Sequence, residues 1–187
     1  MRAIYVETVI HADIDALWEL TQNPALHQQW DLRFSSITPE TVLNSGTTRF
    51  RYARTIPFHT IVGRGTSIGE VHRPDGSRTS ALRFDTSDRL SPLRNGRGYW
   101  RYVPTPDGIR FITGYDYQPG FGRAADIVLR PFITWMTAWS FDRLRLWAET
   151  GELPRWWEPR ARRSVTRLPA HGAMRDAPTT LATLEAP

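Results

Sequence analysis

Residues 121–150 read as one long amphipathic helix, which comes last in the chain after a series of strand-like segments. The segment from Arg123 to Thr150 is about 42 Å long at a rise of about 1.5 Å per residue, so it must cross the whole of a domain of this size. Its large apolar side chains fall within a band about 120° wide, as in a core-facing helix: Val128, Leu129, Phe132, Trp135, Met136, Trp139, Leu146 and Trp147. Because the aromatic side chains are wide, we expect them to hold a sheet away from the helix and to leave a cavity for a hydrophobic ligand.

The segments before this helix predict an antiparallel sheet. Residues 3–11 form a strand, and two short helices follow it, each with a capping signal: Asp13 before the first and Asn23-Pro24 before the second, which ends near Trp30. Further strand-like segments lie at about 35–41, 47–55, 59–71, 78–87, 97–104 and 109–118. Strands this close together, without helices between them, must pair antiparallel. We therefore predict an α+β fold of about seven strands, closed by a long C-terminal helix.

The composition excludes several kinds of site. The chain of 187 residues contains no cysteine, which excludes disulfides, zinc–thiolate sites, iron–sulfur clusters and a thiol nucleophile. Its histidines show none of the spacings typical of metal ligands, so we expect no metal site and no cofactor. The N-terminus lacks the pattern of a signal peptide, and no apolar run reaches the about 18 residues that span a bilayer. We expect a cytoplasmic protein.

Positive charge is concentrated near the C-terminus. All 24 basic residues are arginines, and the formal net charge is +5. Residues 155–175 contain one acidic residue, Glu158, and six arginines: Arg155, Arg160, Arg162, Arg163, Arg167 and Arg175. After Gly151 the chain is also rich in proline and poor in aliphatic side chains. We therefore predict one domain over residues 1–151 and an Arg/Pro-rich tail over 152–187, disordered in part or as a whole.

The tail leaves two interpretations open. It either makes weak contact with an anionic membrane surface or with nucleic acid, or it is a solvated segment whose Trp156 and Trp157 fold back against the body. The charges of the body nearly balance, which argues against specific nucleic-acid binding. The state of assembly, monomer or homodimer, is left open.

Two segments match catalytic motifs in the wrong structural context. Gly65-Thr-Ser67-Ile-Gly69 fits the hydrolase pattern G-x-S-x-G, which requires a sharp strand-to-helix turn, whereas here it lies within a predicted strand. Gly120-Phe-Gly122-Arg-Ala-Ala125 fits the dinucleotide-binding pattern G-x-G-x-x-A, but no parallel βαβ unit surrounds it. We interpret the first segment as strand and the second as the turn into the long helix.

Short motifs in the body resemble those of a known superfamily. Residues Ile10–Trp18 are similar to the opening I-x-A-P-x-x-x-V-W of the START-like (SRPBCC, helix-grip) superfamily, with Asp13 in place of the proline. Asn23–Trp30 resembles its D-P-x-x-x-x-x-W segment, and Gly108–Ile112 its last strand, G-T-x-V-T. Together with the order of elements over residues 3–150, these motifs indicate the polyketide cyclase/dehydrase and lipid-transport branch.

This resemblance implies a curved antiparallel sheet that grips the long helix and leaves a tunnel between them. In this superfamily such tunnels bind lipids, sterols, polyketides or other apolar molecules, and some members catalyse aldol-type cyclisation or dehydration. We therefore expect a carrier or sensor of a hydrophobic small molecule, such as a lipid or polyketide. The alternative is a polyketide cyclase/dehydratase that uses acid–base residues in the same cavity, without a metal or nucleotide cofactor.

Alternation along the strands identifies the side chains that face this tunnel. In the last strand they are Ile109, Phe111, Thr113, Tyr115 and Tyr117, whereas near Trp100 the direction is open, because Tyr99 competes for the inner face. The predicted ligand site consists of Phe50, Tyr52, Phe84, Trp100, Tyr115, Tyr117, Phe132, Trp135, Met136, Trp139 and Arg143. Arg143 either lies at the tunnel mouth or pairs with a carboxylate, while Ile127 and Phe141 project from the opposite side of the helix. The alternative, a solid core, is disfavoured by the number of large aromatic side chains.

Acid–base chemistry would need a base near the substrate and a donor for a developing oxyanion. Tyr115 and His59 are the candidates for these roles, and Tyr117, Glu70 and His72 are further groups of the required type. The sequence does not bring these side chains together. Whether the protein is an enzyme is therefore left open.

Overall fold

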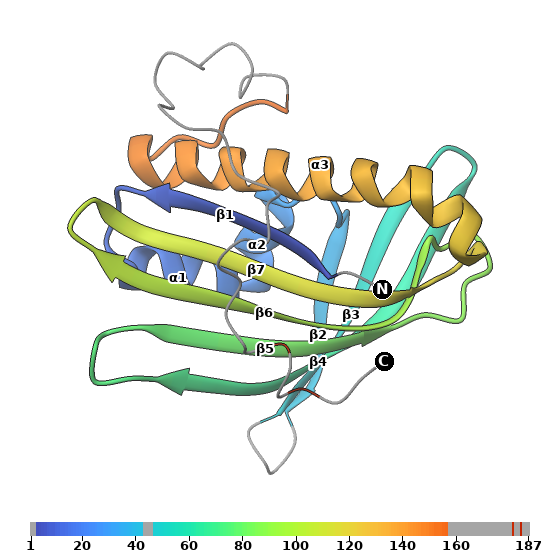
Figure 1. Cartoon of the computed structure of the whole chain (residues 1–187), viewed down its shortest axis with the longest axis horizontal. Helices are drawn as coiled ribbons and strands as arrows, with labels where there is room; N and C mark the ends of the chain where they lie inside the picture. The colour runs from blue at the N-terminus through green and yellow to red at the C-terminus, as the bar shows by residue number, and fades with distance from the viewer. Residues whose placement is uncertain (1–2, 43–46, 157–180, 182–183, 185–187) are drawn as a thin grey trace.

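The computed structural model describes residues 3–42, 47–156, 181 and 184. Its elements follow the predicted order of one strand, two short helices, six strands and a long helix (Figure 1). Their bounds are β1 (Ile4–Ile10), α1 (Ile14–Gln22), α2 (Pro24–Trp30), β2 (Ser36–Val42), β3 (Thr48–Ile56), β4 (His59–His72), β5 (Arg78–Asp85), β6 (Leu93–Thr105), β7 (Gly108–Pro119) and α3 (Gly122–Thr150). Most of the basic tail predicted from the sequence, residues 157–180, lies outside the described residues.

The strands form one antiparallel sheet in the order β1-β7-β6-β5-β4-β3-β2. The first strand pairs with the last, so that Ile4 is opposite Tyr115 and Ile10 is opposite Ile109. Figure 1 shows α3 running along the length of the curved sheet, with α1 and α2 beneath the C-terminal half of the helix. The predicted helix-grip fold is therefore confirmed. No helix within the described ranges is both long enough and apolar enough to span a membrane.

The two short helices begin at the capping residues that the sequence predicts. The Asp13 carboxylate accepts hydrogen bonds from the backbone N–H groups of Asp15 and Ala16, at 2.8 and 3.1 Å. Asn23 caps α2, and Pro24 occupies the first helical position, where a helix has no use for the missing N–H. Local chemistry therefore accounts for where both helices start.

The core lies where α1 and α2 pack between the sheet and the C-terminal half of α3. Phe141 of α3 stacks on Phe111 of β7 with ring centroids 4.6 Å apart, and Trp30 of α2 contacts both Phe141 and Trp100. Leu17 and Trp30 are completely buried in this core, so they anchor the short helices to the sheet.

The buried face of α3 is rotated from the predicted one over the first half of the helix. Val128, Phe132 and Trp135, which the periodicity placed toward the core, are 74, 56 and 44% exposed. The central buried face consists instead of Ile133, Thr137, Ser140, Phe141 and Leu144. Thr137 and Ser140 can lie on this face because each hydroxyl donates to a carbonyl one turn back, at 2.9 Å in both cases. The pattern of large apolar side chains could not reveal that these two hydroxyl residues are buried. The same pattern placed Phe141 on the opposite side of the helix, whereas Phe141 belongs to the core.

The faces of the strands follow the predicted alternation. On β7 the inward set packs into the main core through Ile109, Phe111, Tyr115 and Tyr117. The ambiguity on β6 is removed, because Trp100 faces inward whereas Tyr99 packs on the other side of the sheet, against Tyr5 and Ile112. Leu181 packs on this outer cluster, so at least one residue of the predicted tail contacts the domain.

Both catalytic look-alike motifs lie in the predicted contexts. Residues 65–69 are part of β4, and residues 120–125 form the turn from β7 into α3. Gly122 has a φ of 80°, a backbone conformation that favours glycine at this turn.

Candidate functional site

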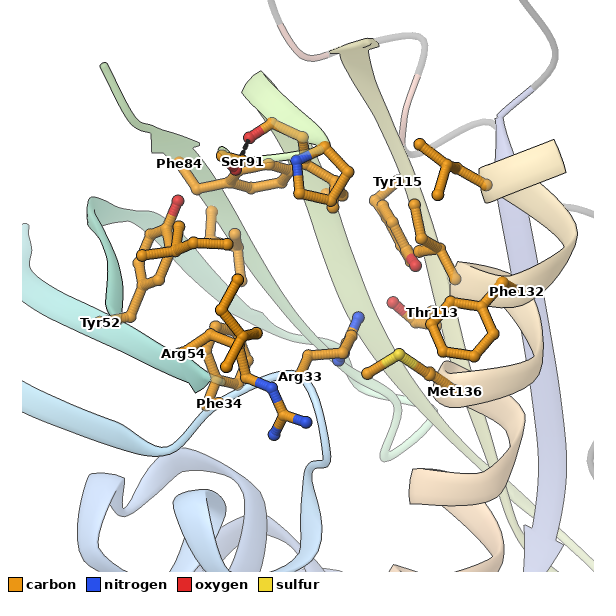
Figure 2. Close-up of a pocket in the computed structure, with 18 of the residues that line it drawn as sticks. Arg33, Phe34, Tyr52, Arg54, Phe84, Ser91, Thr113, Tyr115, Phe132 and Met136 are labelled. Atoms are coloured by element: carbon orange, nitrogen blue, oxygen red, sulfur yellow. Dashed lines mark hydrogen bonds between the residues drawn. The ribbon is translucent and has the colours of Figure 1, made fainter. Parts of the chain in front are cut away.

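A cavity of about 500 Å³ lies between the sheet and the first half of α3. This is within the range of about 300–1,000 Å³ that is typical of small-molecule sites. Its walls come from α2 and the loop after it, from β3 to β7, and from residues 129–136 of α3 (Figure 2). Most lining side chains are aromatic or aliphatic, and the charged ones are Arg33 and Arg54. This part of the interior is hollow and not a solid core.

The cavity exists because inward aromatic rings lie flat against glycines of the neighbouring strand. A Cβ atom added at Gly65 would overlap the ring of Phe50, its cross-strand partner. Three such pairs line the sheet side of the cavity: Phe50–Gly65, Tyr52–Gly63 and Phe84–Gly96. With any larger residue at these glycines, the rings would have to turn into the open space.

Exposed apolar side chains border the opening of the cavity. Leu90, Phe121 and Phe132 line it and yet remain 49, 47 and 56% exposed, so they form its rim. The apolar surface continues along α3, because Phe132 stacks on Trp135 with ring centroids 5.8 Å apart, and Trp135 lies 5.5 Å from Trp139. A ligand can therefore enter between largely apolar groups.

Most of the residues predicted from the sequence line the cavity: Phe50, Tyr52, Phe84, Trp100, Tyr115, Phe132 and Met136. Their role in binding a ligand stays a prediction. Phe34, Arg33 and His27, from α2 and the loop after it, also line the cavity but are not among the predicted residues. Arg54 is not among them either, although it alternates with Phe50 and Tyr52 and so belongs to the inner face.

The other predicted residues lie outside the cavity: Tyr117, Trp135, Trp139 and Arg143. The rotation of α3 about its axis places the two tryptophans outside the cavity. Trp135 is on the outer side of the helix, and the Nε1 group of Trp139 donates to the carbonyl of Trp156 at 2.9 Å. This contact agrees with the interpretation in which Trp156 folds back against the body.

Tyr117 and Arg143 have structural contacts instead. The Tyr117 hydroxyl donates to the Asp126 carboxylate in the first turns of α3, at 2.6 Å. Arg143 is buried, and its Nη2 donates to the carbonyl of Gln29 at 2.9 Å, so it ties α3 to α2 and does not lie at the tunnel mouth.

The two candidate catalytic residues are not brought together. Tyr115 lines the cavity and shares a hydrogen bond of 2.8 Å with Thr137, and burial raises the pKa of its phenol, which is therefore neutral at neutral pH. His59 lies outside the cavity, with its Nε2 2.8 Å from the Asp88 carboxylate. In the part of the chain that the structure describes, no three metal-ligating side chains come together.

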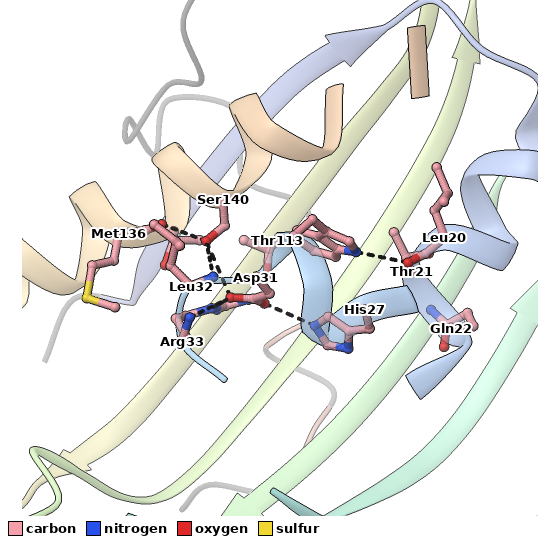
Figure 3. A network of polar contacts seen from close by, with 12 residues as sticks. Leu20, Thr21, Gln22, His27, Asp31, Leu32, Arg33, Thr113, Met136 and Ser140 are labelled. Carbon is pink, nitrogen blue, oxygen red and sulfur yellow. Dashed lines mark hydrogen bonds and ion pairs between the residues drawn. The ribbon is translucent and has the colours of Figure 1, made fainter. Parts of the chain in front are cut away.

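A polar network that no sequence pattern predicted lies in the cavity wall (Figure 3). The buried Asp31 carboxylate accepts hydrogen bonds from Nε and Nη2 of Arg33, at 2.9 and 2.6 Å. It also contacts Nε2 of His27, one turn earlier, at 3.0 Å. The hydroxyl of Ser140 on α3 accepts from the N–H of Leu32 at 2.9 Å, and its single proton is shared between the Met136 carbonyl at 2.9 Å and this carboxylate at 3.4 Å. The network joins α2, the loop after it and α3.

Burial and the contacts within the network together set the charges of Asp31 and His27. Burial by itself raises the pKa of Asp31, but the charge of Arg33 and the hydrogen bonds from Arg33 and His27 outweigh it and hold the pKa well below its usual range. Burial lowers the pKa of His27 and outweighs the opposing effect of Asp31. His27 is therefore neutral at neutral pH. Because an ionised carboxylate only accepts hydrogen bonds, the His27 proton is on Nε2, and Nδ1 is the basic nitrogen.

We expect the fold to lose stability as the pH falls from about 7 to about 5, because the pKa of His27 is lower in the folded chain than in the unfolded chain, where it is about 6.5. Below that pH the unfolded state binds the additional proton, so the contribution of neutral His27 to folding is present above about 6.5 and is lost below it. His27→Gln should flatten this part of the profile. The measurement is the free energy of unfolding by denaturant at each pH; an equally steep profile in the variant would contradict the assignment.

Comparison with known proteins supports the architecture. Residues 1–172 match the model of the family "polyketide cyclase / dehydrase and lipid transport". The uncharacterized membrane protein YndG of Bacillus subtilis is 41% identical over 160 residues, which are 82% of this chain and 60% of that protein. This chain therefore spans less than two thirds of the length of that relative.

Solved structures with low sequence identity share the fold. A STAR-related lipid transfer protein from Xanthomonas axonopodis is 15% identical, with a TM-score of 0.53 over 76% of this chain and 83% of the other. The di-domain ARO/CYC protein StfQ from the steffimycin biosynthetic pathway is 13% identical, with a TM-score of 0.59 over 78% of this chain and 50% of StfQ. Human StAR-related lipid transfer protein 5 is 10% identical, with a TM-score of 0.58 over 76% of this chain and 73% of that protein.

The family match and the helix-grip architecture agree with the motifs of the first strand and the short helices. The chain belongs to the polyketide cyclase/dehydrase and lipid transport family of the START-like (SRPBCC) superfamily.

Proposed function

We propose that this protein is a carrier or sensor that holds one hydrophobic small molecule, such as a lipid or polyketide, between the sheet and α3. The observation that carries the proposal is the cavity of about 500 Å³ with its aromatic and aliphatic walls. The exposed rim of Leu90, Phe121 and Phe132 supports it, because an apolar ligand can enter there without crossing a polar surface. Family membership and the lipid transfer proteins of the same fold are consistent with this role.

Native mass spectrometry of gently purified full-length protein tests the proposal. We expect one apolar molecule per chain, either carried through purification or taken up from a panel of lipids and aromatic polyketides. The bound molecule should leave with its mass unchanged. If no molecule co-purifies and none binds from the panel, the carrier proposal is wrong. Membrane contact through the basic tail stays a prediction, because residues 157–180 lie outside the described residues.

A second candidate is a cyclase or dehydratase acting in the same cavity. The observation that favours it is His27, which lines the cavity as a neutral imidazole oriented by Asp31, with Nδ1 as its basic nitrogen. A histidine held by a carboxylate in this way can act as a general base. The same mass measurement separates the two functions, because a dehydratase would release a polyketide-like thioester with its mass lower by one water, and His27→Gln would stop this loss.

A further inference from the structure

Arg54 interrupts the apolar inner face of β3. Four inward positions of this strand line the cavity, and Arg54 lies among Phe50, Tyr52 and Ile56. Figure 2 shows Arg54 and Phe34 on one side of the cavity and Phe132 and Met136 on the other, with Arg33 between them. Arg54 is half-buried, so water still reaches part of its side chain. An apolar molecule that fills the cavity would displace this water, and the charge would then need an anionic partner.

The cavity wall itself does not balance this charge. Among the described residues that line the cavity there is no aspartate or glutamate. The charge of Arg33 is balanced by Asp31, and His27 is neutral, so these three groups together leave the wall uncharged. Within the described part of the chain, Arg54 has no ion-pair partner. The cavity therefore carries one uncompensated positive charge.

The hydroxyl groups of the wall already have partners in the protein. Those of Tyr52, Ser91 and Thr113 donate to backbone carbonyls at 3.3, 2.6 and 3.1 Å. The Tyr115 hydroxyl shares its hydrogen bond with Thr137. The donors that remain among the described lining side chains are the Arg54 guanidinium, the indole N–H of Trp100 and any N–H of Arg33 that faces neither Asp31 nor the Tyr115 hydroxyl. A site with guanidinium donors in apolar walls is matched by an oxyanion on an apolar body.

We propose that the ligand is an amphipathic anion, with an apolar chain or ring system in the cavity and a single carboxylate or phosphate head group against Arg54 and Arg33. This proposal rests on the proposed function, since it names the chemical class of the molecule held in the same cavity. The head group neutralises Arg54, and the apolar body fills the space between the flat aromatic rings and α3.

Two sets of matched probes test the proposal on the full chain. The fluorescent set is titrated directly, and the dodecyl set competes with a bound fluorescent probe. Phenylnaphthylamine is neutral, and anilinonaphthalene sulfonate carries the same rings plus an anionic group. Dodecanoate and dodecyl phosphate are compared with methyl dodecanoate in the same way. In Arg54→Met, which keeps the length of the side chain but not its charge, we expect the affinity for the anionic probes to fall by about tenfold to a hundredfold, with the neutral probes unchanged. Arg54→Lys should retain a large part of the affinity.

Arg51→Met is the control, because Arg51 lies on the same strand but is exposed and does not line the cavity. It should leave all probes unchanged. If Arg54→Met weakens neutral and anionic probes equally, or affects neither, the head-group proposal is overturned while the carrier function stands. If neither the neutral nor the anionic probes bind the unaltered protein, the carrier function itself fails. A preference for dodecyl phosphate over dodecanoate, or the reverse, supports the proposal and identifies the head group.

Discussion

Replacing Asp31 with alanine should destabilise the folded chain by about 3–5 kcal/mol, because it leaves buried charged and polar partners without their acceptor. The Asp31 carboxylate accepts hydrogen bonds from the backbone N–H and the guanidinium of Arg33. It also contacts Nε2 of His27 and the hydroxyl of Ser140. Without the carboxylate, the Arg33 guanidinium stays in the wall as an unpaired charge, and α3 loses one of its links to α2. Urea denaturation monitored by tryptophan fluorescence measures the change in the free energy of unfolding.

Glu40→Ala is the matched control for this measurement. Glu40 forms a longer ion pair of 3.6 Å with Arg64, whose side chain is 75% exposed. An exposed pair of this kind contributes at most about 1 kcal/mol. If Asp31→Ala costs no more than Glu40→Ala, the buried network is not a main support of the short helices and of α3.

Replacing Gly65 with valine should reduce the affinity for phenylnaphthylamine at least about tenfold by closing the cavity. The added side chain would occupy the place of the Phe50 ring, which must then turn into the open space. Because the ring has somewhere to go, we expect a modest loss of stability, of about 1–3 kcal/mol. Fluorescence titration gives the affinity, and denaturation gives the stability of the same sample.

Gly69→Val is the matched control on the same strand, since a Cβ at Gly69 would meet nothing within 4 Å. This variant should bind the probe as the unaltered protein does. Equal binding by Gly65→Val and Gly69→Val would show that the probe does not occupy the space between the sheet and α3, and it would remove the main support for the proposed function.

Local features of the sequence predicted the frame of the site well. Alternation on β3 and β5 identified Phe50, Tyr52 and Phe84 as inward residues, because side chains of a strand point to opposite faces in turn. The same rule contained the signal for Arg54, which shares their face. What alternation does not reveal is the cross-strand partner, so the glycine opposite each ring, such as Gly65 opposite Phe50, could be recognised only from the register.

The sequence by itself determined the order of the elements, the starts of the short helices and the inward faces of the strands, because caps, turns and alternation act over a few neighbouring residues. Only the tertiary structure decided the rotation of α3 about its axis. Thr137 and Ser140 can be buried because their hydroxyls hydrogen-bond to helix carbonyls, and because Tyr115 of β7 and the N–H of Leu32 supply further partners. It also decided the charges of the cavity wall. Burial, which no local pattern encodes, lowers the pKa of His27 and outweighs the opposing effect of Asp31 four residues along the chain.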